Sequence, residues 1–218
     1  MNNTKHPFLR TAAICSIFAP LTLFAGDLLL VIVERRFEWT VALWLAFVLF
    51  VPAIFGLTYL AFDNGSRLAL IGGACAFFGA MAGASMQVLF RVYAVLNEAG
   101  AEQAIELLQK TMKLIATTQM IGIFFPIGLI LLSISIYRSR IFNRITPPLL
   151  ALGAILFPIG RIGGSAIAVI GSDIVLIGAF GFIGWHIMTG TKTQAHSLEG
   201  KFAELNRGVA SIEHSAEN

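Results

Sequence analysis

Charged residues are scarce in this chain. Of its 218 residues only 12% are Asp, Glu, Lys or Arg, whereas 57% are hydrophobic. Soluble domains usually carry about 25% charged residues, and a soluble fold of this length could not hide so much apolar surface in one core. The composition therefore excludes an ordinary soluble domain and indicates an integral membrane protein.

Cysteine is almost absent as well. Cys15 and Cys75 both lie inside apolar runs, where we expect them to behave as small buried hydrophobic residues. Two cysteines exclude a disulfide framework and a cysteine-based zinc site. The four histidines lack metal-ligand spacing, so we expect no metal and no cofactor. The basic residues form no stripe interleaved with aromatic residues, which argues against nucleic acid as a partner.

Catalytic motifs are missing too. The sequence contains no H-E-x-x-H, no G-x-S-x-G and no P-loop. The apolar runs also lack the paired aspartates that an intramembrane protease would need. We therefore expect no enzymatic activity, and the one enzymatic alternative is lipid chemistry with Asp27 as a general acid or base.

Long apolar runs are what the sequence has instead. A membrane span needs about 20 predominantly apolar residues, and six segments qualify. They cover roughly residues 11–33, 40–62, 68–96, 114–137, 147–170 and 172–189. Short polar stretches separate them, and Gly171-Ser172-Asp173 is the predicted separator of the last two. The sequence thus predicts an all-α bundle of six transmembrane helices within residues 1–190.

Three further stretches complete the predicted organisation. Residues 99–113 keep the periodicity of an amphipathic helix, which we expect on the outer membrane surface or as an extension of the fourth span. Residues 191–218 are polar, and we expect them to form a cytoplasmic tail. The apolar run that follows Arg10 is too long for a signal peptide, so we expect it to be retained as the first span.

The placement of Lys and Arg predicts the orientation. With the N-terminus in the cytoplasm, nine of these residues face the cytoplasm and four face outward. The positive-inside rule favours this arrangement. We therefore expect a multi-pass protein with both termini in the cytoplasm.

Internal similarity suggests a repeat. Three stretches share an aromatic residue or proline, then small residues and then a polar residue: 20–27, 78–85 and 158–165. Either the chain consists of three related hairpins, or apolar runs resemble one another by chance. Prolines also recur near the middle of four spans: Pro20, Pro52, Pro126 and Pro158. Either these prolines kink helices that open into a cavity, or they reflect how common proline is in membrane helices.

Two ionisable residues, Asp27 and Arg161, lie deep inside the predicted spans at matching depth. A carboxylate fits the fork of a guanidinium, and an isolated Arg at that depth would cost at least about 2.5 kcal/mol, so we expect them to pair. Further polar residues at similar depth complete the candidate binding site: Ser85, Gln87, Arg91, Gln119 and Ser165. Either they line an outward-facing polar cavity, or the ion pair only fixes the packing while Arg91 reaches the membrane interface.

One stretch carries a family resemblance. The run Y-R-S-R-I-F-N-R-I at 137–145, followed by L-L-A-L-G at 149–153, resembles a bacterial family of small multi-span membrane proteins of unknown function. The resemblance covers roughly residues 121–164. It implies about six helices and a bacterial inner-membrane setting, and it transfers no activity and no site residues.

Two functions follow as alternatives. In the first, the cavity binds or transports a small anionic or zwitterionic molecule or a lipid, and the chain forms a homodimer because it is short for a monomeric transporter. In the second, the protein is an accessory, assembly or sensor subunit whose helices pack on partner membrane proteins. Membrane lipids are expected partners in both cases.

Overall fold

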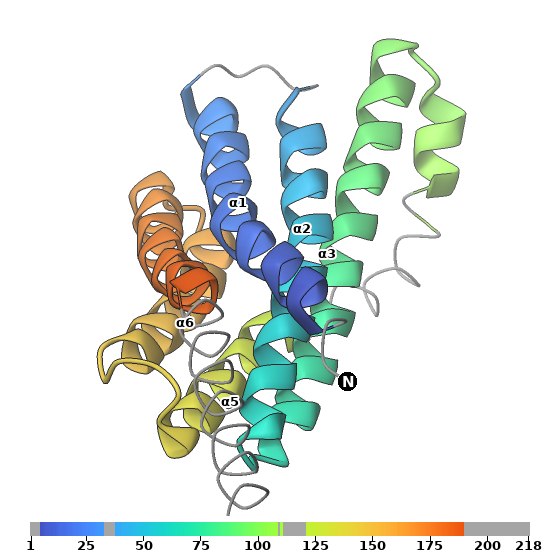
Figure 1. Cartoon of the computed structure of the whole chain (residues 1–218). Coiled ribbons are helices and arrows are strands. Elements are labelled where there is room, and N and C mark those ends of the chain that lie inside the picture. The colour runs from blue at the N-terminus through green and yellow to red at the C-terminus, as the bar shows by residue number, and fades with distance from the viewer. Residues whose placement is uncertain (1–4, 33–37, 109, 111–120, 190–218) are drawn as a thin grey trace, which may run out of the picture.

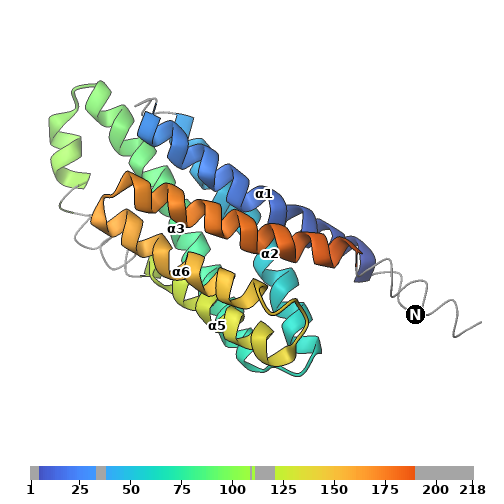
Figure 2. The ribbon, with the colours of Figure 1, turned by 90° about the vertical axis from the view of Figure 1, so that its left-hand side faces the viewer.

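The protein is a bundle of helices (Figures 1 and 2). The computed structural model describes residues 5–32, 38–108, 110 and 121–189. The labelled helices are α1 (Lys5–Ile32), α2 (Glu38–Asp63), α3 (Leu68–Glu98), α5 (Phe124–Ser139) and α6 (Thr146–Gly163). A short helix covers residues 102–108, and a last long helix runs over Ala166–Thr189.

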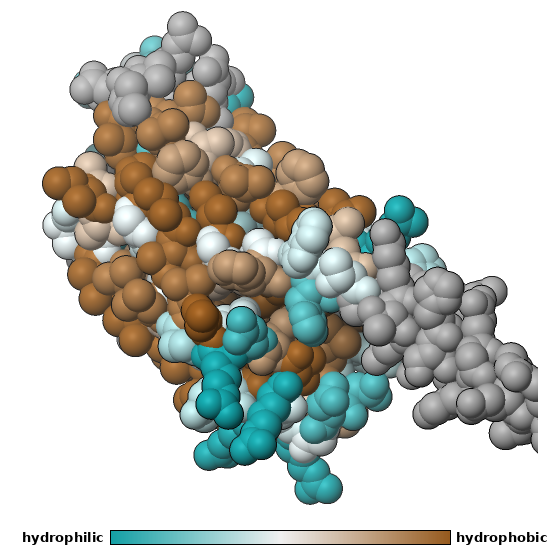
Figure 3. Space-filling model, turned by 60° about the vertical axis from the view of Figure 1, so that its left-hand side comes forward, coloured by the Kyte–Doolittle hydropathy of each residue, from teal (hydrophilic) through white to brown (hydrophobic). Residues whose placement is uncertain are grey.

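Five of these helices are long and apolar enough to cross a membrane: α1, α2, α3, α6 and the Ala166–Thr189 helix. Apolar side chains accordingly cover most of the flank that Figure 3 shows, and hydrophilic ones gather at one end. The helix α5 is also apolar, but its 16 residues are about 24 Å long, less than the hydrocarbon core of a bilayer. Part of the predicted fourth span, 114–137, lies outside the described residues, so the sixth span stays a prediction.

Consecutive helices pack side by side. The helix α1 contacts α2, α2 contacts α3, α3 contacts α5, and α5 contacts α6. The Ala166–Thr189 helix closes the bundle, because Gly184 lies against Ala13 of α1 and Leu176 lies against Gly153 of α6. At the centre, Phe125 of α5 makes ring contacts with Phe50 of α2 and with Phe157 of α6.

Glycines allow α3 to approach α5 closely. A Cβ atom on Gly79 would collide with the backbone of Phe125, and one on Gly128 would collide with the backbone of Ala76. Small residues at such crossings let two backbones come together in a membrane, where dispersion contacts replace the hydrophobic effect as the driving force. The small-residue face of α3 is therefore used inside the bundle.

The predicted boundary between the last two spans is wrong. The helix α6 ends at Gly163, and Gly164 terminates it in the left-handed conformation with φ of +67°. Ser165 then caps the next helix, since its hydroxyl oxygen accepts the Ala168 N–H at 3.4 Å. The capping residues end α6 inside a continuous apolar run, so Asp173 lies in the interior of a helix instead of a loop.

The turn at Gly164 can be tested with a matched pair of variants. Replacing Gly164 with Ala is expected to lower the free energy of unfolding by about 1 kcal/mol, because a Cβ atom is disfavoured in the left-handed region. Gly163→Ala changes the neighbouring helical residue, where no atom lies within 4 Å of an added Cβ, and should not destabilise the protein. Thermal unfolding in detergent would measure the stability of both variants. Equal unfolding midpoints would contradict the left-handed turn at Gly164.

The structure bears on two of the remaining predictions, the prolines and the amphipathic segment. Pro20, Pro52 and Pro158 lie inside helices and Pro126 lies in the first turn of α5, whereas its place in the middle of the fourth span stays a prediction. The helix at 102–108 lies beside the end of α3 (Figures 1 and 2). The tail lies outside the described residues, and the repeat and the orientation stay predictions.

Candidate functional site

Asp27 and Arg161 form the predicted ion pair. Arg161 Nη2 donates a hydrogen bond to Asp27 Oδ2. Asp27 belongs to α1 and is only 2% exposed, whereas Arg161 lies in the last turn of α6 with its side chain 25% exposed. The pair therefore joins the first helix of the chain to the fifth predicted span, at one end of the bundle.

Asp173 is a second carboxylate on the same guanidinium, and the sequence-based interpretation missed it. Its Oδ1 atom lies 3.4 Å from Arg161 Nη2, and the residue is 0% exposed. The Ser172 hydroxyl lies 3.3 Å from the same oxygen and 2.7 Å from the Val169 carbonyl oxygen. The glycines and the serine at 163–165 were the signal that could have moved Asp173 from the predicted loop into a helix.

The Asp27–Arg161–Asp173 cluster has more acid than base. It is neutral when one carboxyl group keeps its proton and carries a net charge of −1 when both are ionised, so in neither state does it present a net positive charge to an anion near Arg161. The sequence predicted no paired aspartates of intramembrane-protease type, and the structure brings Asp27 and Asp173 together inside the helices. The Asp27 and Asp173 carboxyl groups share the guanidinium of Arg161 and also lie within hydrogen-bond reach of each other.

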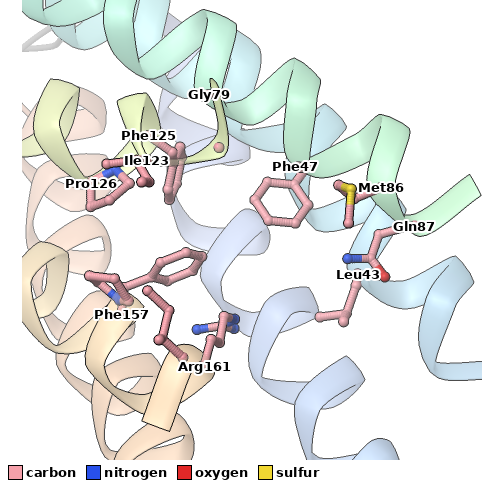
Figure 4. Close-up of a pocket in the computed structure, with 14 residues that line it drawn as sticks. Leu43, Phe47, Gly79, Met86, Gln87, Ile123, Phe125, Pro126, Phe157 and Arg161 are labelled. Carbon is pink, nitrogen blue, oxygen red and sulfur yellow. The ribbon is translucent and has the colours of Figure 1, made fainter. Parts of the chain in front are cut away.

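A cavity of about 580 Å³ lies next to this cluster, between α2, α3, α5 and α6 (Figure 4). Its walls are mostly apolar and include the rings of Phe47, Phe125 and Phe157. Arg161 from α6 and Gln87 from α3 are the polar side chains of its lining, and Figure 4 shows both beside the same space. The guanidinium lies over the Phe157 ring, with Cζ 3.9 Å from the ring centroid.

Two buried polar atoms of this lining have no hydrogen-bond partner among the described residues. They are Arg161 Nη1, a donor, and Gln87 Oε1, an acceptor. A buried polar group without a partner costs about 1–3 kcal/mol, and native proteins usually satisfy such groups with protein, water or a ligand. The cavity thus offers one donor and one acceptor to a molecule that enters it.

The other predicted site residues lie elsewhere. Ser85 is exposed and donates to the Met81 carbonyl oxygen of its own helix at 2.9 Å. Arg91 lies one turn beyond Gln87 on α3, and Ser165 caps a helix at the surface, and neither lines the cavity. Gln119 lies outside the described residues. The structure therefore brings Asp27, Arg161 and Gln87 together and leaves out three of the predicted residues.

The aromatic walls were not predicted, because phenylalanine inside an apolar run looks like any other core residue. The prolines were a usable signal, since Pro126 and Pro158 both line the cavity. Comparison of the chain with models of known protein families, with curated proteins and with solved structures finds no match. The family resemblance over residues 121–164 therefore stays a prediction.

Proposed function

We propose that this membrane protein binds an uncharged amphipathic molecule, such as a lipid alcohol or amide, in the cavity between α2, α3, α5 and α6. The observation that carries the proposal is the unpartnered donor and acceptor, Arg161 Nη1 and Gln87 Oε1, in an otherwise apolar cavity. A volume of about 580 Å³ falls within the usual range for small-molecule sites.

The two polar atoms select the chemistry of the ligand. A hydroxyl or primary amide can both accept a hydrogen bond, as from Arg161 Nη1, and donate one, as to Gln87 Oε1. A carboxylate or a phosphate diester can only accept, and it would find no net positive charge at the Asp27–Arg161–Asp173 cluster. Of the ligands expected from the sequence, the lipid is therefore retained and the anion is disfavoured.

The ion cluster supports this site without being the ligand-binding group itself. Asp27 and Asp173 both contact Nη2 of Arg161, which leaves Nη1 as the atom without a partner. Two buried carboxylates hold the guanidinium in one orientation over Phe157. The ion pair thus has both of the roles that the sequence left open. It fixes the packing of the helices, and it orients the guanidinium that binds the ligand.

The accessory-subunit alternative would be favoured by an exposed groove of small residues on α3 or on α6, the fifth predicted span. Gly72 and Gly79 instead lie against α5, while Gly73 and Gly83 lie against Thr58 and Phe47 of α2. The small residues of α3 are thus used within the bundle, and on α6 Gly160 lies against Val169 while Gly163 is open. The cavity favours a binding protein. We keep the bacterial inner membrane, cytoplasmic termini and a homodimer as parts of this proposal, with the cavity in the outer half of the membrane.

Filling the cavity tests the proposal. The purified full chain would be irradiated with a diazirine-bearing fatty alcohol or with the fatty acid of the same chain, and labelled peptides would be located by mass spectrometry. We expect the alcohol to label the cavity lining. Met86→Trp, which adds volume to that lining, should reduce this labelling about tenfold, a loss of about 1.4 kcal/mol.

The control is Val88→Trp, the same new side chain at a residue of α3 that is 53% exposed and lies outside the cavity lining. It should leave the labelling unchanged. Gln87→Leu removes the acceptor at similar volume and should weaken labelling by the alcohol more than labelling by the acid. Equal labelling in Met86→Trp and Val88→Trp, or stronger labelling by the acid, would contradict the proposed function.

A further inference from the structure

Arginines gather at the opposite end of the bundle from the Asp27–Arg161–Asp173 cluster. Arg67 lies in the turn between α2 and α3, and Arg138, Arg140 and Arg144 lie at or near the turn between α5 and α6. Two hollows open there, of about 410 Å³ and 650 Å³, and Arg138 lines both. Figure 3 shows the hydrophilic side chains of this end below the apolar flank.

The two turns are held rigidly. A hydrogen bond of 2.6 Å between Ser135 and Ser66 ties α5 to the turn between α2 and α3. The buried Phe142 anchors the turn between α5 and α6 through its ring contact with His186, with centroids 5.0 Å apart. The arginines therefore project from a fixed framework, which reduces the entropy lost when they bind a ligand.

Arg140 occupies a backbone position that does not suit it. It ends α5 with φ of +53° and is the one non-glycine residue with positive φ among the described residues. Glycine is the usual residue at this position of a helix C-terminus, because a side chain is disfavoured in the left-handed region. The arginine is therefore present for something other than the stability of the turn.

Within the described part of the chain, the charges of these arginines are unmatched. None of Arg67, Arg138, Arg140 and Arg144 forms an ion pair with another described residue. A guanidinium binds phosphate oxygens with two parallel hydrogen bonds. The larger hollow also has apolar walls from Ile136, Phe142 and Pro147 beside its arginines, which suits a ligand with a charged head and an apolar body.

We propose that Arg138, Arg140 and Arg144 bind the phosphate group of an anionic phospholipid at this end of the bundle. The exposed Tyr137 ring next to them is of the kind that lies at the level of lipid headgroups. Basic pockets between membrane helices recognise such headgroups. This site is independent of the cavity at the other end and would remain if the proposed function were wrong.

Lipid retention tests the proposal. The purified full chain would be incubated with phosphatidylglycerol or phosphatidylcholine of identical acyl chains, and the retained lipid counted by native mass spectrometry. We expect preferential retention of phosphatidylglycerol. Arg140→Gly and Arg144→Gln should each weaken it about fivefold. Arg10→Gln, at an exposed arginine of α1 outside both hollows, should not.

The variant Arg140→Gly distinguishes a role of Arg140 in lipid binding from a role in the stability of the fold. Because glycine suits the left-handed position, the midpoint of thermal unfolding in zwitterionic detergent should stay the same or rise while phosphatidylglycerol is lost. A lower midpoint would show that Arg140 serves the fold. Equal retention of both lipids, or an equal loss in Arg10→Gln, would overturn the site. Equal stabilisation by inorganic phosphate would overturn the assignment to a lipid.

Discussion

Replacing Arg161 with methionine is expected to lower the free energy of unfolding by about 3–5 kcal/mol. The substitution keeps most of the side-chain volume but leaves Asp27 and Asp173 as two buried carboxylates without a cation. Breaking a buried ion pair from one side costs more than the pair contributes, because the remaining charge stays in a medium of low dielectric constant. Thermal or detergent-induced unfolding of the purified protein would measure the loss.

Two further variants make this result specific. Arg10→Met applies the same chemical change to an exposed arginine of α1 and should alter stability by less than about 0.5 kcal/mol. The triple variant Asp27→Asn, Arg161→Gln, Asp173→Asn removes all three charges together and should recover most of the stability. An Arg161→Met protein as stable as the unchanged chain would mean that the cluster does not form.

The same triple variant also separates fold from function. It removes the guanidinium that supplies the donor Nη1 together with the two carboxylates that orient it. We expect a folded protein in which the diazirine-bearing fatty alcohol labels the cavity more weakly. Unchanged labelling would show that the cluster fixes packing only and takes no part in binding.

Gly79→Ala is expected to destabilise the protein by about 3 kcal/mol. The added Cβ would collide with the backbone of Phe125, and neither α3 nor α5 can move aside without opening their crossing. The variant should also disturb the cavity, since Gly79 and Phe125 both line it. The unfolding midpoint would report the first effect, and alcohol labelling would report the second.

Gly181→Ala is the matched control for this second prediction. Gly181 lies inside the Ala166–Thr189 helix, and no atom lies within 4 Å of a Cβ added there. Alanine in a helix interior is favoured over glycine by about 0.5–1 kcal/mol, so this variant should be at least as stable as the unchanged chain. Equal destabilisation at both positions would contradict the close crossing of α3 and α5.

Much of the fold could be predicted because a membrane span is recognised by the hydropathy of its own consecutive residues, summed along the chain. The first three predicted spans, 11–33, 40–62 and 68–96, lie close to α1, α2 and α3. The same sum ended the fifth span at residue 170 instead of Gly163, since Gly164 breaks the helix while the run around it stays apolar. A capping signal of two or three residues is easily hidden in such a run.

The candidate site was predicted in part, for a related reason. The pairing of Asp27 with Arg161 followed from depth and charge alone, because a single buried cation needs a single buried anion. Asp173 was missed because its depth depends on where the preceding turn lies. Ser85 was placed in the site by depth, but its position around α3 turns it to the exposed surface of the bundle.

The sequence by itself determined that this chain is an all-α membrane protein with an intramembrane ion pair. Scarce charge and long apolar runs leave lipid as the only adequate solvent, and an isolated Arg161 would be too costly there. The tertiary structure alone decided that Arg161 has two acid partners, that Gln87 faces it across an aromatic cavity, and that Arg140 ends a helix in a strained position. Those features depend on which side chains of separate helices meet, and no local sum along the sequence contains that information.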